Sequence, residues 1–359
     1  MANVEVKRVL LLAGAMASHV DSRYTLTLAK ALNQRELRVH VVCARGSRIE
    51  PFHEAHIAVE TVAYLDRPVL FRLGRRSLLR VVAEVQPQVL HVQTLDLTRV
   101  GVRLAQASGL PLIVTALHSP PGGRDPWLLQ PQVRRFIAVN EAVREDFVNM
   151  ARVPKERIAV VPEGIDVLEY PMWSGATSGS APTVGIIAPF EKAYGHENFL
   201  AAAKLIHAAS PDTQFVIAGD GSLEDDIRRQ VSALGLAKNV VFASRIGDYR
   251  PFLEVVDILV MPAVRDGISF SIMEAMAMGK VVIASSIGGL YILLKNGETG
   301  YLVGRGDTGE IARRVLELVK DRPVARKIGE NARRFVEQNF GLTSLALRTI
   351  RVYEDVAGA

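Results

Sequence analysis

The chain has 359 residues, of which 49% are hydrophobic and 23% are charged. This length suggests two domains, and the composition excludes a disordered or collagen-like chain. A single cysteine, Cys43, excludes an intramolecular disulfide and a cysteine-based zinc site, and it suits a reducing compartment. No apolar run reaches the roughly 18 residues of a membrane span. The short apolar run near the N-terminus is interpreted as a buried strand rather than a signal peptide, so we expect a cytoplasmic protein.

The formal net charge is +5, and the excess lies in the first half. Residues 1–168 hold 22 Lys and Arg against 16 Asp and Glu, whereas residues 169–359 hold 21 against 22. An anionic partner or membrane surface is therefore expected to meet the first half. Nucleic acid is not expected as a partner, because no helix-turn-helix, zinc-finger or aromatic-plus-basic RNA signature occurs.

Short apolar runs alternate with helical patterns along residues 1–168. The expected strands are 9–13, 39–43, 89–92, 112–116, 135–139 and 158–161, with helical spacing over 22–32 and 99–108. Such alternation predicts a parallel sheet with helices on both faces. Ligands of open sheets of this kind bind beyond the carboxyl ends of the strands.

A basic amphipathic stretch covers residues 67–85. Its arginines are Arg67, Arg72, Arg75, Arg76 and Arg80, and they alternate with leucines, valines and a phenylalanine. The pattern fits a helix that lies on an anionic membrane, at its inner face, and equally a solvated outer helix of the first domain. Both interpretations stay open.

The alternation breaks at residues 169–182, where a Gly-, Ser- and Pro-rich stretch indicates a domain linker. It then resumes with expected strands at 184–188, 215–218, 240–242, 258–261, 281–284 and 300–303, and helical patterns at 196–209, 223–234, 249–256, 271–278, 308–318 and 326–339. We therefore predict an α/β protein with two doubly wound domains, 1–168 and 183–340, facing a central cleft. A C-terminal helix over 341–359 could return to the first domain.

The segment RDGISFSIMEAMAMG, residues 265–279, places a turn and a helix start directly after the strand 258–261. Free backbone N–H groups and the dipole at a helix start favour a phosphate. Gly267 allows close approach of a ligand, and the carboxylates of Asp266 and Glu274 suit sugar and ribose hydroxyls. The alternative is a plain strand–turn–helix with a capping acid.

This segment resembles the signature of glycosyltransferase family 4, whose members are retaining, nucleotide-sugar-dependent transferases with two Rossmann-like domains, the GT-B type. In the match, residues 266–270 (DGISF) are followed by Glu274-Ala275-Met276-Ala277. Further matches lie in order at 160–166, 216–221, 288–289 and 296–300. The resemblance implies that the first domain binds the acceptor and the second binds the nucleotide sugar.

The resemblance also implies roles for single residues. Glu274 would hydrogen-bond the ribose, and Asp266 would contact the donor sugar. The expected nucleotide-sugar site comprises Gly14, Ser244, Arg245, Gly267, Ile268, Ser269, Phe270, Ser271 and Glu274, with N–H groups from Ser269 to Ser271 on the diphosphate and with Ser244 and Arg245 beside the base. His118 matches a histidine at the sugar side of the cleft, and its alternative is a solvated loop histidine.

Two departures from the family pattern concern the diphosphate. Pro189 and Tyr194 stand where the family has an arginine and a lysine, and neither supplies a cation; without a replacement, two charge-assisted contacts worth roughly 3–6 kcal/mol are missing. Lys192 lies two residues from the expected lysine and could supply the cation, so it joins His118 and Asp266 as a catalytic candidate.

The resemblance thus implies a retaining glycosyltransferase of cell-envelope polysaccharide synthesis, with a UDP- or GDP-type donor and a glycan or lipid-linked acceptor. The alternative is a non-catalytic or weakened homologue that binds nucleotide or sugar or scaffolds a synthesis complex. No cofactor or metal is expected, and His53 and His56 lack the acidic neighbours of a metal cluster beyond Glu50 and Glu54 in what is expected to be a surface turn. A nicotinamide-dependent enzyme is disfavoured, because no G-x-G-x-x-G follows the first strand.

Overall fold

The computed structural model describes residues 5–16, 19–67, 71–120, 125–172, 181–244, 248–264, 270–287 and 289–358, with the backbone alone for 19–21, 71–73 and 244. Its contacts divide the chain into two units. Unit 1 comprises Met1–Gly164 and Phe340–Ala359, and unit 2 comprises Ile165–Asn339. The last residues of the chain therefore belong to the same unit as the first.

In the described residues, the sheet of unit 1 has seven parallel strands in the order β3-β2-β1-β4-β5-β6-β7. They are β1 (Arg8–Leu12), β2 (Arg38–Ala44), β3 (Ala58–Val62), β4 (Val89–Val92), β5 (Leu112–Ala116), β6 (Val133–Ala138) and β7 (Ile158–Val160). Every residue of β4 and β5 is buried, which is typical of a parallel sheet covered on both faces.

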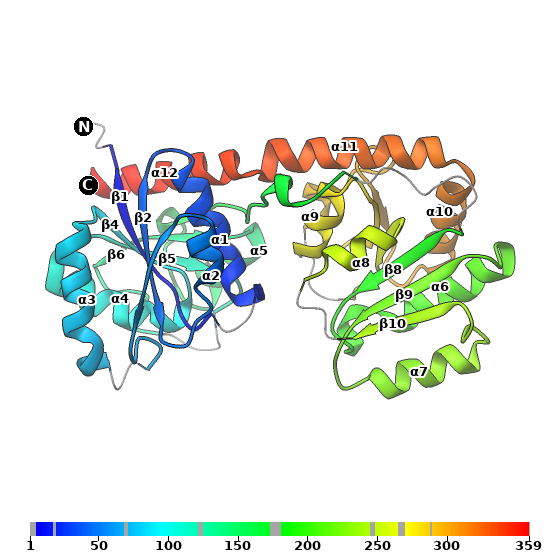
Figure 1. Ribbon diagram of the computed structural model, residues 1–359, viewed down its shortest axis with the longest axis horizontal. Coiled ribbons are helices and arrows are strands. Elements are labelled where there is room, and N and C mark those ends of the chain that lie inside the picture. The colour runs from blue at the N-terminus through cyan, green and yellow to red at the C-terminus, as the bar shows by residue number, and fades with distance from the viewer. Residues whose placement is uncertain are drawn as a thin grey trace. The chain divides into compact units, whose positions relative to one another are not determined.

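The helices of unit 1 cover both faces of this sheet (Figure 1). They are α1 (His19–Asn33), α2 (Glu50–Glu54), α3 (Phe71–Val85), α4 (Thr98–Ser108), α5 (Glu141–Asn149) and α12 (Leu342–Ala357). Right-handed connections that run from β1 in opposite directions put α1 on one face and α3 and α4 on the other. Helix α12 packs against α1. The segment of His53 and His56, expected to be a surface turn, instead contains the short helix α2, because Phe52 is buried in the core.

A buried chain of hydrogen bonds joins α12 to the sheet of unit 1. The Tyr353 hydroxyl lies 2.7 Å from Nδ1 of His91, and Nε2 of His91 lies 2.7 Å from Oγ1 of Thr115. The Tyr24 hydroxyl lies 3.5 Å from the same threonine oxygen. Burial lowers the pKa of His91 to about 3, so its ring is neutral at pH 7 and this chain of contacts carries no charge.

Helix α3 spans most of the basic stretch that was expected to be amphipathic. Its apolar residues face the sheet, since Leu78 and Val81 are buried and the neighbouring leucine and valine pack against the core. A Cβ built on Gly74 would lie 2.5 Å from the carbonyl oxygen of Ala63, so the helix lies directly on the chain after β3. Its arginines from Arg75 onward are exposed, and Arg80 pairs with Glu60.

No helix within the described ranges is both long enough and apolar enough to cross a bilayer.

Within the same limits, the sheet of unit 2 has six parallel strands in the order β10-β9-β8-β11-β12-β13. They are β8 (Thr183–Ile187), β9 (Gln214–Gly219), β10 (Val240–Ser244), β11 (Ile258–Met261), β12 (Val281–Ser285) and β13 (Tyr301–Val303). As in unit 1, the first strand lies in the centre and the chain winds outward in both directions. The prediction of two doubly wound α/β halves is confirmed.

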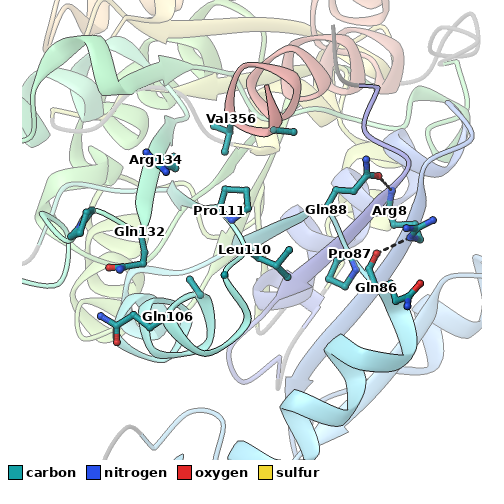
Figure 2. Close-up of a pocket in the computed structure, with 14 residues that line it drawn as sticks. Arg8, Gln86, Pro87, Gln88, Gln106, Leu110, Pro111, Gln132, Arg134 and Val356 are labelled. Carbon is teal, nitrogen blue, oxygen red and sulfur yellow. Dashed lines mark hydrogen bonds between the residues drawn. The ribbon is translucent and has the colours of Figure 1, made fainter. Parts of the chain in front are cut away.

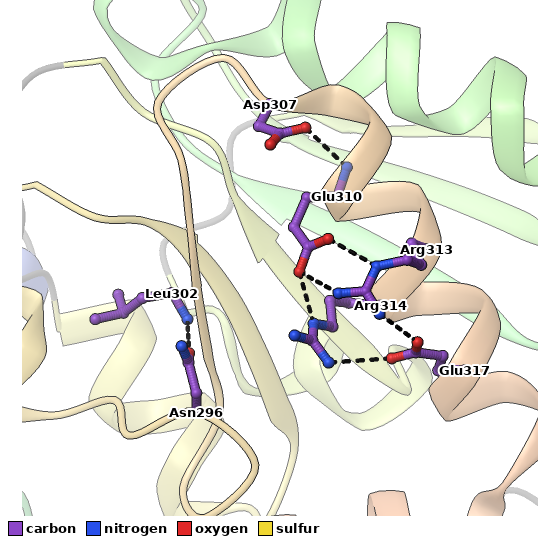
Figure 3. A network of polar contacts seen from close by, with 7 residues as sticks. All are labelled: Asn296, Leu302, Asp307, Glu310, Arg313, Arg314 and Glu317. Carbon is purple, nitrogen blue, oxygen red and sulfur yellow. Dashed lines mark hydrogen bonds and ion pairs between the residues drawn. The ribbon is translucent and has the colours of Figure 1, made fainter.

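The helices of unit 2 are α6 (His196–Ala209), α7 (Glu224–Ala233), α8 (Arg250–Val255), α9 (Phe270–Ala277), α10 (Thr308–Lys320) and α11 (Arg322–Phe340). The Asp307 side chain caps α10 by accepting a hydrogen bond from the N–H of Glu310 at 2.9 Å. Figure 3 shows the exposed face of α10, where Glu310 and Glu317 both pair with Arg313 and Arg314. Exposed pairs contribute little individually, so the buried apolar face of α10 anchors the helix.

Candidate functional site

The centre of the unit 2 sheet brings two loops together. Strands β8 and β11 are neighbours, and the chain leaves them toward opposite edges, so their carboxyl ends form the point where doubly wound sheets bind ligands. The N–H of Val264, after β11, donates to the carbonyl of Ala193, after β8, at 2.8 Å. Gly195 has φ +75°, and a Cβ built on it would lie 2.0 Å from the Pro262 carbonyl oxygen. Only glycine allows these loops to meet.

A third loop, after β9, lies against the loop after β8. The N–H of Phe190 donates to the carbonyl of Asp220 at 2.7 Å. Gly219 has φ +152°, and a Cβ built on it would lie 2.0 Å from the Ala188 carbonyl oxygen. The Gly-x-Gly turn at this place is therefore explained by close backbone approach, independent of any ligand.

Helix α9 begins beyond the carboxyl end of β11 and carries Glu274, the described carboxylate of the expected site. Glu274 is 2% exposed, and its Oε1 accepts a hydrogen bond from the Tyr170 hydroxyl at 2.8 Å. A carboxylate oriented in this way can accept hydrogen bonds from paired hydroxyl groups, which is what a ribose presents.

The segment that holds Tyr170 is tied to α9 by one arginine of α11. Nη1 of Arg333 donates to the carbonyl of Tyr170 at 2.6 Å, and Nη2 donates to the carbonyl of Val167 at 3.2 Å. The same guanidinium donates to the carbonyl of Ala277 at the end of α9. Arg333 thereby fixes the chain around Tyr170 relative to the helix that carries Glu274.

Sequence reasoning missed both Tyr170 and Arg333. Tyr170 falls in a stretch expected to be linker, and its partner Glu274 lies 104 residues away along the chain. Arg333 falls in a charged amphipathic pattern, where an arginine usually faces solvent. No local signal in the sequence singles out either residue.

Lys192, the candidate for the missing cation, lies in a short 3₁₀ turn after β8 and is exposed. It lines a hollow of about 560 Å³ together with Glu191, Glu197, Asp226 and Arg229. Arg229 pairs with Asp226, so two further carboxylates remain beside the lysine. The charge balance of this hollow does not by itself favour a diphosphate.

His196 lies at the start of α6, directly after Gly195, and is 4% exposed. Its ring meets that of Phe190 edge-on, with the ring centroids 5.2 Å apart. Burial lowers the pKa of His196 to about 4, against a smaller opposing effect of the Ala188 backbone. The ring is therefore neutral at pH 7, and it packs the loop after β8 against the unit.

The remaining expected residues of unit 2 divide into two groups. Phe270 and Ser271 are the first two residues of α9, and Ser244 is the last residue of β10, so all three lie at the carboxyl edge of the sheet with Glu274 and Lys192. The residues outside the described ranges are Arg245, Asp266, Gly267, Ile268 and Ser269.

Two expected residues belong to unit 1. Gly14 follows β1, and a Cβ built on it would lie 3.6 Å from Oγ1 of Thr94, which is an ordinary contact. His118 follows β5 and is exposed. Both lie at the carboxyl edge of the unit 1 sheet, as does Glu163 after β7. Burial raises the pKa of Glu163 to about 7, against a smaller opposing effect of Arg23.

Two family models match the chain. The model for "Glycosyltransferase Family 4" matches residues 22–168, and the model for "Glycosyl transferases group 1" matches residues 173–335. The first range lies mainly in unit 1 and the second lies in unit 2, and together they cover most of the chain.

The curated relatives match either a part of the chain or most of the chain at low sequence identity. The lipopolysaccharide core biosynthesis mannosyltransferase LpcC of Rhizobium leguminosarum bv. viciae is 26% identical over 308 residues, which cover 82% of this chain and 85% of that protein. Two other bacterial relatives are matched over 40% and 38% of their length, so the chain spans about two fifths of those proteins.

Solved structures match over nearly the whole chain. A glycosyltransferase from Rickettsia africae ESF-5 gives a TM-score of 0.82 at 16% identity, covering 98% of this chain and 99% of that one. Anabaena Alr3699/HepE in complex with UDP-glucose gives 0.74 at 18% identity, covering 97% and 99%. The two family models together place the chain in glycosyltransferase family 4, and the two parallel sheets with these structural matches show that it has the GT-B fold.

Proposed function

We propose that this chain transfers a sugar, with retention, from a UDP- or GDP-type nucleotide sugar to a glycan or lipid-linked acceptor of cell-envelope polysaccharide synthesis. The observation that carries the proposal is Glu274, a buried carboxylate oriented by Tyr170 at the ligand-binding edge of a doubly wound sheet. The UDP-glucose bound by HepE supports the donor class, and the role named for LpcC supports the process.

In this proposal the residues act together without an enzymic nucleophile. Glu274 binds the ribose, the N–H groups of Ser269 to Ser271 hold the diphosphate, and Asp266 contacts the donor sugar. Lys192 supplies a cation to the diphosphate, and His118 of unit 1 acts on the sugar side. The bond from the anomeric carbon to the diphosphate oxygen breaks as the bond to the acceptor oxygen forms, and the leaving phosphate takes the acceptor proton.

Calorimetry with UDP, GDP and ADP tests the central contact. Glu274→Gln keeps the shape of the side chain but removes a charged acceptor, so affinity for the preferred nucleotide should fall by about 1.5–3 kcal/mol, or roughly ten- to a hundredfold. Glu317→Gln, on the exposed face of α10, is the matched control and should bind as the wild type does. Equal affinity of the Glu274 variant and the wild type would remove Glu274 from the site.

A second candidate function is a non-catalytic homologue that binds nucleotide or sugar. The exposed Pro189 at the position of the family's arginine, and the carboxylates beside Lys192, favour it. Hydrolysis of the matching sugar nucleotides separates the two candidates. Under the transferase proposal, Lys192→Ala lowers turnover about ten- to a hundredfold, and Pro189→Arg with Tyr194→Lys restores it. Nucleotide binding without turnover in the wild type, with activity created by the double substitution, would establish the non-catalytic function.

A membrane contact of unit 1 also belongs to this proposal. Because the apolar face of α3 is buried, the contact would rest on the exposed arginines Arg75, Arg76 and Arg80 and on anionic lipid.

A further inference from the structure

A hollow of about 670 Å³ lies at the amino ends of the unit 1 strands, the edge of the sheet opposite to Gly14 and His118. Its lining comes from the starts of β1, β4, β5 and β6, from the end of α4 and from the end of α12 (Figure 2). Ligands of doubly wound sheets occupy the carboxyl edge. The proposed sugar transfer therefore assigns no role to this hollow.

The charged side chains in the described lining of the hollow are all positive. Arg8 and Arg134 line it, and there is no Asp or Glu among the described residues of the lining. Nε of Arg8 donates to the carbonyl of Gln86 at 2.7 Å, which orients the guanidinium at the rim. Within the described ranges neither arginine has an ion-pair partner. Both cations thus remain available to an incoming anion.

Further positive charge lies beside this rim. The pKa of Arg157 is lowered by burial and then by the charges of Arg135 and Arg134, and Glu156 offsets only part of this effect. The guanidinium groups of Arg134 and Arg135, at the start of β6, therefore both repel that of Arg157. An oxyanion bound beside Arg134 would offset that repulsion, because opposite charges attract.

The rest of the lining suits a sugar ring. Pro87, Leu110 and Pro111 present C–H surface, and the Gln106 amide stands exposed at the rim (Figure 2). The Gln88 amide is already used, since its oxygen accepts from the N–H groups of Lys7 and Arg8 at 2.7 and 3.1 Å. A mostly apolar floor with a few fixed polar groups is the usual composition of a small-molecule site.

We infer that this hollow binds an anionic saccharide, a sugar that carries a phosphate or a carboxylate, at a site separate from that of the donor. Arg134 binds the oxyanion in a planar fork, as guanidinium groups bind phosphate and carboxylate, and the charge of Arg8 at the other end of the hollow adds to the attraction (Figure 2). Gln106 hydrogen-bonds ring hydroxyls, and the prolines contact the C–H face of the ring. The inference does not depend on the proposed transfer.

The inferred saccharide site is tested by calorimetry on the full chain at low salt. Four probes are used: glucose 6-phosphate, glucuronate, glucose and inorganic phosphate. At least one of the two anionic sugars should bind about tenfold more tightly than glucose and inorganic phosphate. Arg8→Gln combined with Arg134→Gln should weaken that binding at least about tenfold, and added salt should weaken it in the wild type. Arg45→Gln, an exposed arginine after β2 at the opposite edge, is the matched control and should bind as the wild type does.

Several outcomes would overturn the inference: no binding of either anionic sugar at millimolar concentration, or binding of glucose or inorganic phosphate as tight as that of the anionic sugar that binds best. Unchanged affinity in the double variant would do the same. Binding of one anionic sugar alone would identify the phosphate or the carboxylate as the recognised group. If the double variant fails to fold, Arg134→Gln alone decides the question, because the Arg134 side chain makes no hydrogen bond or ion pair within the described ranges.

Discussion

The first six strands of the two units follow the same order in their sheets, but the polar side chains that the two units bury differ. Unit 1 encloses a neutral chain of contacts, from Tyr353 through His91 to Thr115. Unit 2 encloses ionisable groups, among them Glu274 and Lys280, of which the lysine is 0% exposed. Burial lowers the pKa of Lys280 to about 7, against smaller opposing effects of Asp257 and Glu254. The same strand plan thus accommodates a neutral hydrogen-bonded network in the core of unit 1 and buried ionisable side chains in unit 2.

The largest expected effect concerns the loops after the first strand of each unit. Gly195→Ala in unit 2 would place a Cβ 2.0 Å from a backbone oxygen at positive φ, whereas Gly14→Ala in unit 1 would create an ordinary contact. We expect the first change to lower the free energy of unfolding by about 4 kcal/mol or more, and the second to change it by less than about 1 kcal/mol. Urea denaturation measures both.

Gly235→Ala is the control that measures the cost of positive φ alone, without the contact between the new Cβ and a neighbouring atom. Gly235 also has φ +75°, but a Cβ built there would meet nothing within 4 Å. Its cost should stay near 1 kcal/mol. If Gly195→Ala costs no more than Gly235→Ala, the close approach of the loops in unit 2 has no energetic weight.

The buried lysine should make the stability of unit 2 depend on pH. Between about pH 7 and 10.5 the unfolded chain keeps a proton that folded Lys280 has released, so stability rises with pH through this window. The slope contributed is at most about 1.4 kcal/mol per pH unit, and Lys280→Met should remove it.

The measurement is the difference in unfolding free energy between Lys280→Met and wild type at pH 7, 8 and 9. The exposed Lys320→Met is the control, and its difference from wild type should stay constant. A difference for Lys280→Met that is also independent of pH would show that the lysine keeps an ordinary pKa.

A smaller effect distinguishes two buried tyrosines. Tyr353→Phe leaves Nδ1 of His91 without its hydroxyl partner and should cost about 1–3 kcal/mol in stability, with nucleotide affinity unchanged. Tyr170→Phe removes the donor that orients Glu274 and should lower nucleotide affinity about tenfold. Unfolding and calorimetry are measured on both variants. A gain of nucleotide affinity in Tyr170→Phe would mean that the hydroxyl competes with the ribose instead of positioning its acceptor.

The smallest effect concerns the basic surface of unit 1. Arg75 and Arg76 should each contribute about 1 kcal/mol to binding of anionic vesicles. Changing both to glutamine should release the protein from such vesicles at low salt, while Arg326→Gln and Arg334→Gln in unit 2 should not. Equal weak adsorption of both variants and the wild type would leave α3 as a helix in solvent.

The sequence predicts the alternation of strands and helices well, because buried parallel strands give short apolar runs. It misses β3, α2 and α5. Strand β3 is a half-exposed edge strand with a glutamate in its middle, and α5 is short and charged, although its Asn140 cap is a usable signal. The motif around Glu274 draws attention to this carboxylate from sequence alone, and its assignment to a nucleotide site stays a prediction. Its hydrogen-bond donor, and the tyrosine that completes the network of His91, come from distant segments that no local pattern connects.

The return of α12 to unit 1 has a consequence for biosynthesis. A ribosome delivers His91 and Thr115 early, but their partner Tyr353 emerges only after all of unit 2 has been translated. Domains usually complete their folding in the order of synthesis. Here the face of the first sheet that α12 covers stays open on the nascent chain while the second sheet can already close. During this interval the face is open to molecular chaperones, and a premature stop in the last turns would damage the unit that was synthesised first.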